Sequence, residues 1–341
     1  MFGQRQPMPM KIFVVLDLIP DPSGRQAIAN RFRELAAVSN SGTHSLVFED
    51  AADAEVFLFP THGLERPEIY AIPQHPLVRA APDRCFLWCD RDLPVPVLPG
   101  VYAALPADRF DRRFHRTVFY LSKANNEVRH TPPTITLPFL ASFQGSRSSR
   151  LRARLFAMHF NPSIQVGETG ALWQEFIFGQ GFDNGAEQIG SYARLMRDSK
   201  FILCPRGNGV ASYRIFETLL AGRVPVVMAD DYVPPVAGEK PWMLTFPEHS
   251  LNRLEKFLEQ QEPNFPKLAE GAAEVYQDYF ADTRKVHFLG EQLASIRQTN
   301  PIRSTGDLRR YWFRVRGTQL IRDMVTSLKV RAGRLIQTFR N

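Results

Sequence analysis

The chain has 341 residues, 44% of them hydrophobic and 23% charged, a composition typical of a soluble globular protein with two domains of ordinary size. Its three cysteines have no cluster of histidines or further cysteines nearby that would complete a zinc site, so we interpret them as buried thiols in a reducing compartment. The net charge of +7 does not indicate nucleic-acid binding, because residues 307–341 hold nine Lys or Arg against two Asp and leave the rest of the chain neutral overall.

The first half of the chain predicts an α/β domain. The predicted strands are the apolar runs at 12–16, 56–59, 85–89 and 118–121, and a helical pattern covers 25–37. The first run is too short for a signal peptide or a membrane span. Asp17, His62, Asp90 and Asp92 follow three of the strands, and functional groups gather at the carboxyl ends of parallel strands. The proline-rich stretch 93–106 is predicted to be an extended loop.

The second half shows the same kind of pattern after a linker marked by Pro132, Pro133 and Pro138. Strands are predicted at 137–143, 164–166, 201–204 and 224–228, and helices at 150–159, 188–197 and 211–221. We therefore predict two Rossmann-like domains, residues 1–132 and 133–300, followed by a basic amphipathic helical tail, 301–341.

Two glycine-containing loops in the second half have groups suited to phosphate. Residues 145–147 (Gly-Ser-Arg) follow the first predicted strand of this half, and residues 206–209 (Arg-Gly-Asn-Gly) follow the third. Glycine lets the backbone approach a ligand closely, and a helix that follows such a loop offers free N–H groups to an anion. A plain helix N-cap by Ser146 or Ser148 is the structural alternative for the first loop.

Charged side chains strengthen the second loop as a candidate site. Arg206 and Arg214 have forked donors that suit a diphosphate. Glu217 lies one helical turn after Arg214, where its carboxylate is suited to accept two ribose hydroxyls. The alternative that the spacing leaves open is a surface ion pair between Arg214 and Glu217 on an ordinary helix.

The central segment, residues 199–235, reads SKFILCPRGNGVASYRIFETLLAGRVPVVMADDYVPP. It resembles the donor-binding segment of exostosin-family glycosyltransferases. In that family a strand ends in Cys-Pro-Arg-Gly. The elements that follow it are, in order, Ser-x-Arg, Glu, Ala-Gly-x-x-Pro-Val-Val, an acidic pair and Tyr-Val-Pro-Pro. Weaker similarity extends to residues 143–147 and 75–78. The resemblance implies an inverting enzyme with two Rossmann-like domains facing a cleft, the arrangement called GT-B. The second domain would hold the donor nucleotide and the first the acceptor.

The donor-binding residues expected from the loops and the resemblance together are Gly145, Ser146, Arg147, Arg206, Gly207, Asn208, Ser212, Tyr213, Arg214 and Glu217. Arg214 is also expected to act in catalysis on the leaving group. Retaining two-domain glycosyltransferases often carry two glutamates with seven residues between them in this region, and the second would correspond to Glu217. Here the first would fall at Gly209, which disfavours a retaining mechanism of that type.

An inverting transfer needs a base for the acceptor hydroxyl. Asp90 and Asp92 are the first candidates, because they follow a strand of the acceptor-side domain, and His62 and Asp17 come next. For each of them a turn or capping role is the simpler interpretation. An Asp-x-Asp pattern also binds divalent metal in single-Rossmann glycosyltransferases, but the resemblance implies a donor site without metal, so we expect no metal and no cofactor.

We therefore predict an enzyme that transfers a sugar from a nucleotide-diphosphate donor, UDP-linked by expectation, to a glycan or lipid-linked acceptor of a bacterial surface polysaccharide. The chain lacks the anchor usual in animal and plant members of the family, so a soluble bacterial-type cytoplasmic protein is expected. The basic tail, 307–341, is expected either to contact an anionic membrane at its inner face or to pack across the domains.

Two other functions stay open from the sequence. One is a fucosyltransferase-like enzyme that uses a GDP-sugar, although that group usually has Phe-Glu-Asn where this chain has Cys204-Pro205-Arg206. The other is a catalytically silent protein that binds a nucleotide-sugar or a glycan as the partner of a larger synthase. Binding of UDP or of GDP separates the first from our main prediction, and the absence of nucleotide binding favours the second.

Overall fold

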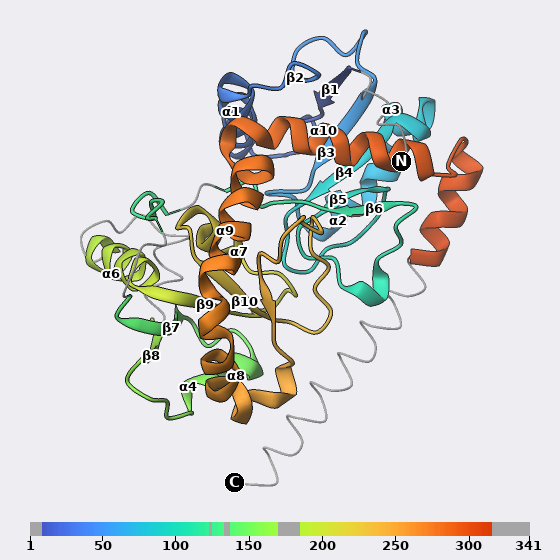
Figure 1. Cartoon of the computed structure of the whole chain (residues 1–341). Helices are drawn as coiled ribbons and strands as arrows, with labels where there is room; N and C mark the ends of the chain where they lie inside the picture. The colour runs from blue at the N-terminus through green and yellow to red at the C-terminus, as the bar shows by residue number, and fades with distance from the viewer. Residues whose placement is uncertain (1–8, 123–124, 133–136, 170–184, 316–341) are drawn as a thin grey trace, which may run out of the picture.

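The structure, a computed structural model, describes residues 9–122, 125–132, 137–169 and 185–315. Two separate parallel sheets form its two halves (Figure 1). The strand order is β2-β1-β3-β4-β5-β6 in the first sheet and β11-β10-β9-β7-β8 in the second. The predicted α/β fold with two Rossmann-like units is confirmed. The domain boundaries themselves stay a prediction.

The first sheet contains β1 (Met10–Val14), β2 (His44–Val47), β3 (Val56–Pro60), β4 (Cys85–Cys89), β5 (Gly100–Tyr102) and β6 (His115–Thr117). Every side chain of β3 and β4 is buried, which is why both strands read as unbroken apolar runs. Helix α1 (Pro22–Val38) begins after Asp21, whose carboxylate accepts hydrogen bonds from the backbone N–H groups of the first turn. The short helices α2 (Arg66–Ala71) and α3 (Pro76–Ala80) follow β3.

Two predictions for the end of this unit were wrong. The stretch 93–106 is not entirely loop, because β5 forms within it, and residues 118–121 are not a strand, because the last strand is β6 just before them. Proline at the flanks of β5 hid its short pattern. Val118 is fully buried and still donates its N–H to the carbonyl of Tyr102, but the chain then leaves the sheet for the linker.

The second unit follows the predicted order of elements closely. Its strands are β7 (Phe139–Gly145), β8 (Ile164–Glu168), β9 (Ser199–Pro205), β10 (Val224–Met228) and β11 (Leu244–Thr245), and its first helices are α4 (Arg150–Phe156), α6 (Gly185–Arg197) and α7 (Arg214–Leu220). Helix α7 begins three residues later than the predicted 211, so the loop after β9 is longer. Gly222 has a φ of +71°, which fits its predicted place just beyond a helix.

The chain then crosses back to the first unit. Helices α8 (Leu254–Gln261) and α9 (Phe265–Val275) pack on the second sheet, and a π-helical turn, Tyr276–Phe280, leads into α10 (Asp282–Thr299). Figure 1 shows α10 crossing beside α1 and the first sheet, and it contacts β2, β5 and β6. Residues 282–299 fall in the predicted second domain but pack with the first, because their buried face fits that sheet.

The described start of the predicted tail also belongs to this core. Residues 305–315 are helical, and Leu308 and Tyr311 are 4% and 6% exposed. The hydroxyl of Tyr311 donates to the carbonyls of Pro96 and Leu98, at 3.0 and 3.1 Å. Packing across the protein, which was the structural alternative for the tail, therefore holds for this part, while residues 316–341 lie outside the described ones.

The two sheets meet at their carboxyl ends. The carbonyl of Asp231, just after β10, accepts a 2.9 Å hydrogen bond from the N–H of Ala107, beyond β5. A Cβ on Gly209, after β9, would lie 2.7 Å from the carbonyl oxygen of Asp92, after β4. The loops that carry the predicted site residues of both units therefore face one another. This is the arrangement that the resemblance implied.

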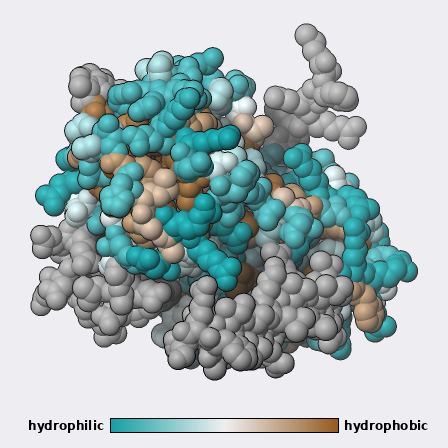
Figure 2. All heavy atoms as spheres, turned by 90° about the horizontal axis from the view of Figure 1, so that it is seen from below, coloured by the Kyte–Doolittle hydropathy of each residue, from teal (hydrophilic) through white to brown (hydrophobic). Residues whose placement is uncertain are grey.

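One face of the molecule is largely polar where its described residues are visible. In the view from below, hydrophilic side chains dominate the described surface and hydrophobic ones show mainly in recesses (Figure 2). The three cysteines are free and buried, as predicted. Among the described residues, the helices are too short or too polar to cross a membrane.

Candidate functional site at the junction of the two sheets

Two neighbouring strands of the second sheet deliver the predicted loops to one place. Strands β7 and β9 pair in parallel, so the loops that follow Gly145 and Pro205 emerge side by side. Ser149 caps α4 by accepting a 3.2 Å hydrogen bond from the N–H of Arg152, and its hydroxyl donates to the carbonyl of Arg206 at 2.8 Å. The first loop is thus bonded to the second. The residue that caps the helix is Ser149, whereas the structural alternative had named Ser146 or Ser148.

Two arginines converge on the ring of Phe143 at the end of β7. The guanidinium carbons of Arg214 and Arg152 lie 4.7 and 5.5 Å from the ring centroid, and that of Arg214 lies 5.6 Å from the ring of Tyr192. Arg214 Nη2 donates to the carbonyl of Gln144 at 2.6 Å. Arg152 donates through Nε and Nη2 to the carbonyl of Pro205, at 3.2 and 3.1 Å. The two cations are therefore held in place by backbone oxygens and aromatic rings.

Neither of these arginines forms an ion pair with a carboxylate of the described residues. Arg214 is only 8% exposed, and burial together with the charge of Arg214 lowers the pKa of Arg152 to about 10, so Arg152 stays charged at neutral pH. Buried charges normally have a bonded partner of opposite sign, because desolvation is costly. Two adjacent guanidinium groups without one form a site suited to an anion.

Polar atoms around the two arginines are also left without partners. Arg214 Nε, Gln144 Oε1 and Thr169 Oγ1 are buried and form no hydrogen bond within the described part of the chain. Native proteins rarely leave several such groups unpaired in one place. The neighbourhood is therefore prepared for a polar ligand.

Both predicted glycines stand where a side chain would obstruct these groups. A Cβ at residue 145 would lie 3.1 Å from Arg214 Nη2 and 3.0 Å from the ring of Phe143. A Cβ at residue 207 would lie 3.1 Å from Ser148 Oγ and 3.4 Å from Arg152 Nη2. The glycines therefore keep the backbone close to the cations.

The other predicted donor-binding residues lie around this site, but they differ in their partners and in their exposure. Arg147 points into an ion pair with Glu168, at 2.6 and 3.0 Å, on the surface. Arg206 Nη1 lies 3.8 Å from Glu248. Ser146 offers its carbonyl to Arg152, Asn208 is exposed at the loop tip and Ser212 is buried. Among the predicted arginines, Arg214 alone lies in the pair on Phe143, while Arg147 is turned to a carboxylate.

Glu217 does not form the surface ion pair with Arg214 that the spacing left open. It is 5% exposed, and its two carboxylate oxygens accept hydrogen bonds from the N–H of Asn125, at 2.9 Å, and the hydroxyl of Tyr192, at 2.6 Å. Burial raises its pKa, against the effect of the Tyr192 hydroxyl. Both oxygens are thus engaged by protein groups, so the role toward ribose hydroxyls stays a prediction.

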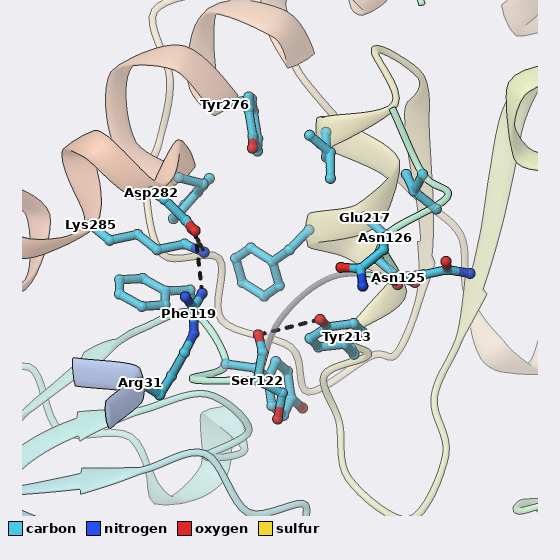
Figure 3. A pocket seen from close by; sticks show the side chains of 15 residues that line it. Arg31, Phe119, Ser122, Asn125, Asn126, Tyr213, Glu217, Tyr276, Asp282 and Lys285 are labelled. Carbon is cyan, nitrogen blue, oxygen red and sulfur yellow. Dashed lines mark hydrogen bonds and ion pairs between the residues drawn. The ribbon is translucent and has the colours of Figure 1, made fainter. Parts of the chain in front are cut away.

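Glu217 borders a cavity of about 390 Å³ between the two units. Figure 3 shows Tyr213, which donates to the carbonyl of Ser122 at 3.3 Å, on one side of it. On the other side Asp282 receives Lys285 Nζ at 2.6 Å and Arg31 Nη2 at 3.4 Å. The predicted Tyr213 therefore joins the second unit to the linker.

The first unit contributes an aspartate and a histidine at the ends of β4 and β3. Asp90 is 7% exposed, and its Oδ2 accepts a 3.1 Å hydrogen bond from the N–H of Leu121. Its Oδ1 lies 3.4 Å from Nδ1 of His62, whose side chain is 49% exposed. This hydrogen bond raises the pKa of His62, while burial opposes it. Asp90 is thus placed to orient His62.

Asp92 lies where the loops of the two units touch. One side of Asp92 is exposed to solvent. Burial of its other side raises the pKa of its carboxyl group, and the charge of Arg152 opposes this shift. The oxygens of Asp90 are both engaged, so the two aspartates do not present a free pair of carboxylates to a cation. His75 Nε2 lies 3.1 Å from Asp17, the last of the predicted strand-end residues, on the surface.

Sequence reasoning missed Arg152, Phe143 and Tyr192. Arg152 is one of three arginines in SRLRAR, and its neighbours Arg150 and Arg154 are exposed. Its position in the first turn of the helix after the Gly145 loop is the one signal in the sequence. No signal in the sequence indicated Tyr192, because its contact with Glu217 joins residues that are 25 positions apart.

Two Rossmann-like units that meet at their carboxyl ends, with an anion-receptive loop pair in one of them, define an α/β protein of the two-unit Rossmann type. The comparisons with known proteins narrow this class. Residues 107–258 match the family model described as the Exostosin GT47 domain, which supports the resemblance of segment 199–235 and a glycosyltransferase of this type.

Curated proteins of plants match parts of the chain. A probable glucuronosyltransferase of Oryza sativa subsp. japonica is 38% identical over 76 residues, which is 22% of this chain and 18% of the relative. A probable glycosyltransferase of Arabidopsis thaliana is 50% identical over 52 residues, 15% of this chain and 10% of the relative. The chain thus matches less than a fifth of the length of these relatives, and a bacterial-type origin stays a prediction.

Solved structures of glycosyltransferases are similar at low identity. The structure of AviGT4, a glycosyltransferase involved in avilamycin A biosynthesis, has a TM-score of 0.42 at 12% identity, covering 85% of this chain and 98% of that one. HepE of Anabaena in complex with UDP and glucose has a TM-score of 0.40 at 8% identity, covering 84% and 98%.

Proposed function

We propose that the protein is an inverting glycosyltransferase that uses a nucleotide-diphosphate sugar, UDP-linked, and a glycan or lipid-linked acceptor. The observation that carries this proposal is the pair of guanidinium groups of the half-buried Arg152 and the buried Arg214, which form no ion pair with a carboxylate of the described chain and lie beyond the carboxyl ends of adjacent parallel strands. A diphosphate is the anion whose size and charge match two forked cations. The match to the Exostosin GT47 domain supports the same class.

In the proposed reaction the acceptor hydroxyl oxygen attacks the anomeric carbon from the face opposite the nucleotide. The bond from this carbon to the β-phosphate oxygen breaks, and the electron pair leaves with the diphosphate. Arg152 and Arg214 stabilise the charge that develops there, which is the main help a protein gives to such a leaving group. The reaction inverts the anomeric centre in a single displacement.

We assign the base to His62, oriented by Asp90. Nδ1 of His62 faces the buried carboxylate, so Nε2 is available for the acceptor proton, and the imidazolium that forms is stabilised by Asp90. Asp92, at the contact with the donor loop, is the alternative base. Asp90 itself is less suited than the sequence suggested, because it is buried and already accepts two hydrogen bonds.

The first test measures thermal stability of the full chain with UDP, GDP, CDP or ADP, each with and without Mn²⁺. We expect UDP to raise the midpoint in a metal-independent way, because a ligand of the folded state stabilises it by mass action. Dependence on Mn²⁺ would contradict the metal-independent site. A shift with GDP alone would favour a fucosyltransferase-like enzyme, and no shift with any nucleotide would favour a silent synthase partner.

The variants Arg152→Lys and Arg214→Lys test the residues. Each keeps the charge but loses the fork, so we expect UDP to bind about tenfold more weakly by calorimetry. Arg154→Lys, on the exposed side of α4, is the matched control and should bind as the unchanged chain does. Unchanged UDP affinity in both site variants would contradict the assignment.

We further propose that the protein acts in the cytoplasm at the inner face of a membrane, through basic residues of 307–341. Arg309 and Arg310 are exposed on the helix whose Tyr311 is buried, so one face packs and the other carries charge. A chain ending at residue 315 keeps the packed part. We expect it to fold normally but to co-sediment less with anionic vesicles than the full chain does. Equal sedimentation would contradict a role for the last 26 residues.

A further inference from the structure

A histidine on the edge strand of the first sheet is locked against α10. The side chain of His44, on β2, is fully buried. A Cβ on Gly290 would lie 2.2 Å from His44 Cγ, so the absence of a side chain at 290 is what admits the imidazole ring to the helix backbone. The N–H of Asn40 also donates to the carbonyl of Thr283 at 3.1 Å, which fixes the chain before β2 to the start of α10 (Figure 1).

Two further ligand-type side chains flank this imidazole on consecutive turns of α10. Nε2 of His44 lies 2.8 Å from Glu291 Oε1, and its ring centroid lies 5.6 Å from that of His287. His287 and Glu291 are four residues apart and so share one face of the helix. One ligand atom from each of the three residues lies within 4.8 Å of the other two.

We propose that His44, His287 and Glu291 form a site for a divalent metal ion of the zinc type. Two imidazoles and one carboxylate are a known zinc ligand set, and water completes the tetrahedron. Ligand atoms in such a tetrahedron are about 3.3 Å apart, so the observed separations need small side-chain rotations only. Glu291 is 38% exposed and His287 is partly exposed, so both can rotate and an ion can enter.

The site is separate from the proposed donor site and does not rest on the proposed function. Its ligands belong to β2 and α10, the helix that returns from the second unit to the first sheet. A bound ion would therefore clip this helix to the sheet edge and stabilise the folded chain. The charge of Arg284 acts against a cation near His287, while Glu291 favours it.

The experiment uses the full chain, freed of metal with a chelator and titrated with Zn²⁺ and Co²⁺. We expect Zn²⁺ at a hundredfold excess over its Kd to raise Tm by about 5 °C. Co²⁺ should give the visible absorption of a four- or five-coordinate ion. Both signals should disappear in His287→Ala and in Glu291→Gln, whose side chains are at the surface, and persist in His249→Ala, an exposed histidine elsewhere.

Three outcomes would overturn the proposal. They are the lack of a Zn²⁺-dependent Tm shift and Co²⁺ spectrum, the persistence of both signals in His287→Ala and Glu291→Gln, and their equal loss in His249→Ala. The first would leave the three residues as a hydrogen-bonded contact between strand and helix. Because UDP is absent from the measurement, its failure is independent of the nucleotide test.

Discussion

At the scale of single residues, the pairing of His62 with Asp90 changes how the candidate base is understood. A strand-end aspartate in a sequence has several simple roles, and Asp90 does fill one of them by holding the N–H of Leu121. Its other oxygen lies within hydrogen-bond distance of His62, at the end of the neighbouring strand, and orients this half-exposed imidazole. The aspartate is a positioning residue in this interpretation.

This pairing predicts a pKa for His62 above its usual value of about 6.5. The hydrogen bond to Asp90 favours the charged imidazolium. It therefore stabilises the fold below pH 6.5, and this contribution is lost as the pH rises through the raised pKa. An NMR titration of the His62 ring should show the raised pKa, and Asp90→Asn should lower it. A pKa unmoved by that variant would refute the dyad. The acidic limb of the pH–rate profile should move in the same direction.

At the scale of elements, the short strand β5 depends on one glycine. A Cβ on Gly100 would lie 2.2 Å from the carbonyl oxygen of Leu87 and 2.5 Å from its nitrogen, both on the partner strand β4. Backbone atoms in the middle of a sheet cannot move aside to make room for an added atom, whereas the end of a flexible side chain can. The glycine is therefore required for the pairing that extends the sheet toward β6.

We expect Gly100→Ala to lower the free energy of unfolding by about 3 kcal/mol, as overpacking of a core does. Chemical denaturation followed by circular dichroism measures this. Gly42→Ala is the control, because a Cβ there meets nothing within 4 Å and should leave stability almost unchanged. Equal stability of the two variants would show that β4 and β5 adjust more freely than the structure indicates.

At the scale of the whole molecule, the two units touch through loops, share a small buried hydrophobic cluster, and are joined by the linker and α10. Gly209 lies at one of these contacts, and a Cβ there would lie 2.7 Å from the Asp92 carbonyl oxygen. A side chain there would push the units apart at their carboxyl ends, where Val210 and Ala211 pack against Ala104 in a small buried cluster.

Gly209→Ala should lower Tm without nucleotide by a few degrees, because the added Cβ meets the backbone of Asp92 beside the buried cluster of Ala104, Val210 and Ala211. We expect the UDP-dependent rise in Tm to fall by at least half, because Asp92 and the donor loop no longer meet as they do here. Gly306→Ala, where the nearest atom is 3.5 Å away, is the control. A full UDP response in Gly209→Ala would mean that donor binding does not need the closed arrangement.

The sequence by itself determined the α/β class, the two-unit plan and the position of the two glycine-containing loops after β7 and β9. Hydrophobic runs, glycines and the 199–235 pattern are local signals, and they predicted β4 and β10 to the residue. Element boundaries elsewhere moved by a few residues, and α7 begins at Arg214 because the loop before it serves the junction. Local chemistry is enough to predict elements whose burial repeats along the chain.

Only the tertiary structure decided which charged residues act together. Arg223 is fully buried because the carbonyls of Arg197 and Thr131, distant in sequence, accept its hydrogen bonds. The partnership of Arg152 with Arg214 joins two helices, and that of His44 with α10 spans 247 residues to Glu291. Such contacts leave no periodic trace in a sequence, because they arise from chain segments brought together by packing.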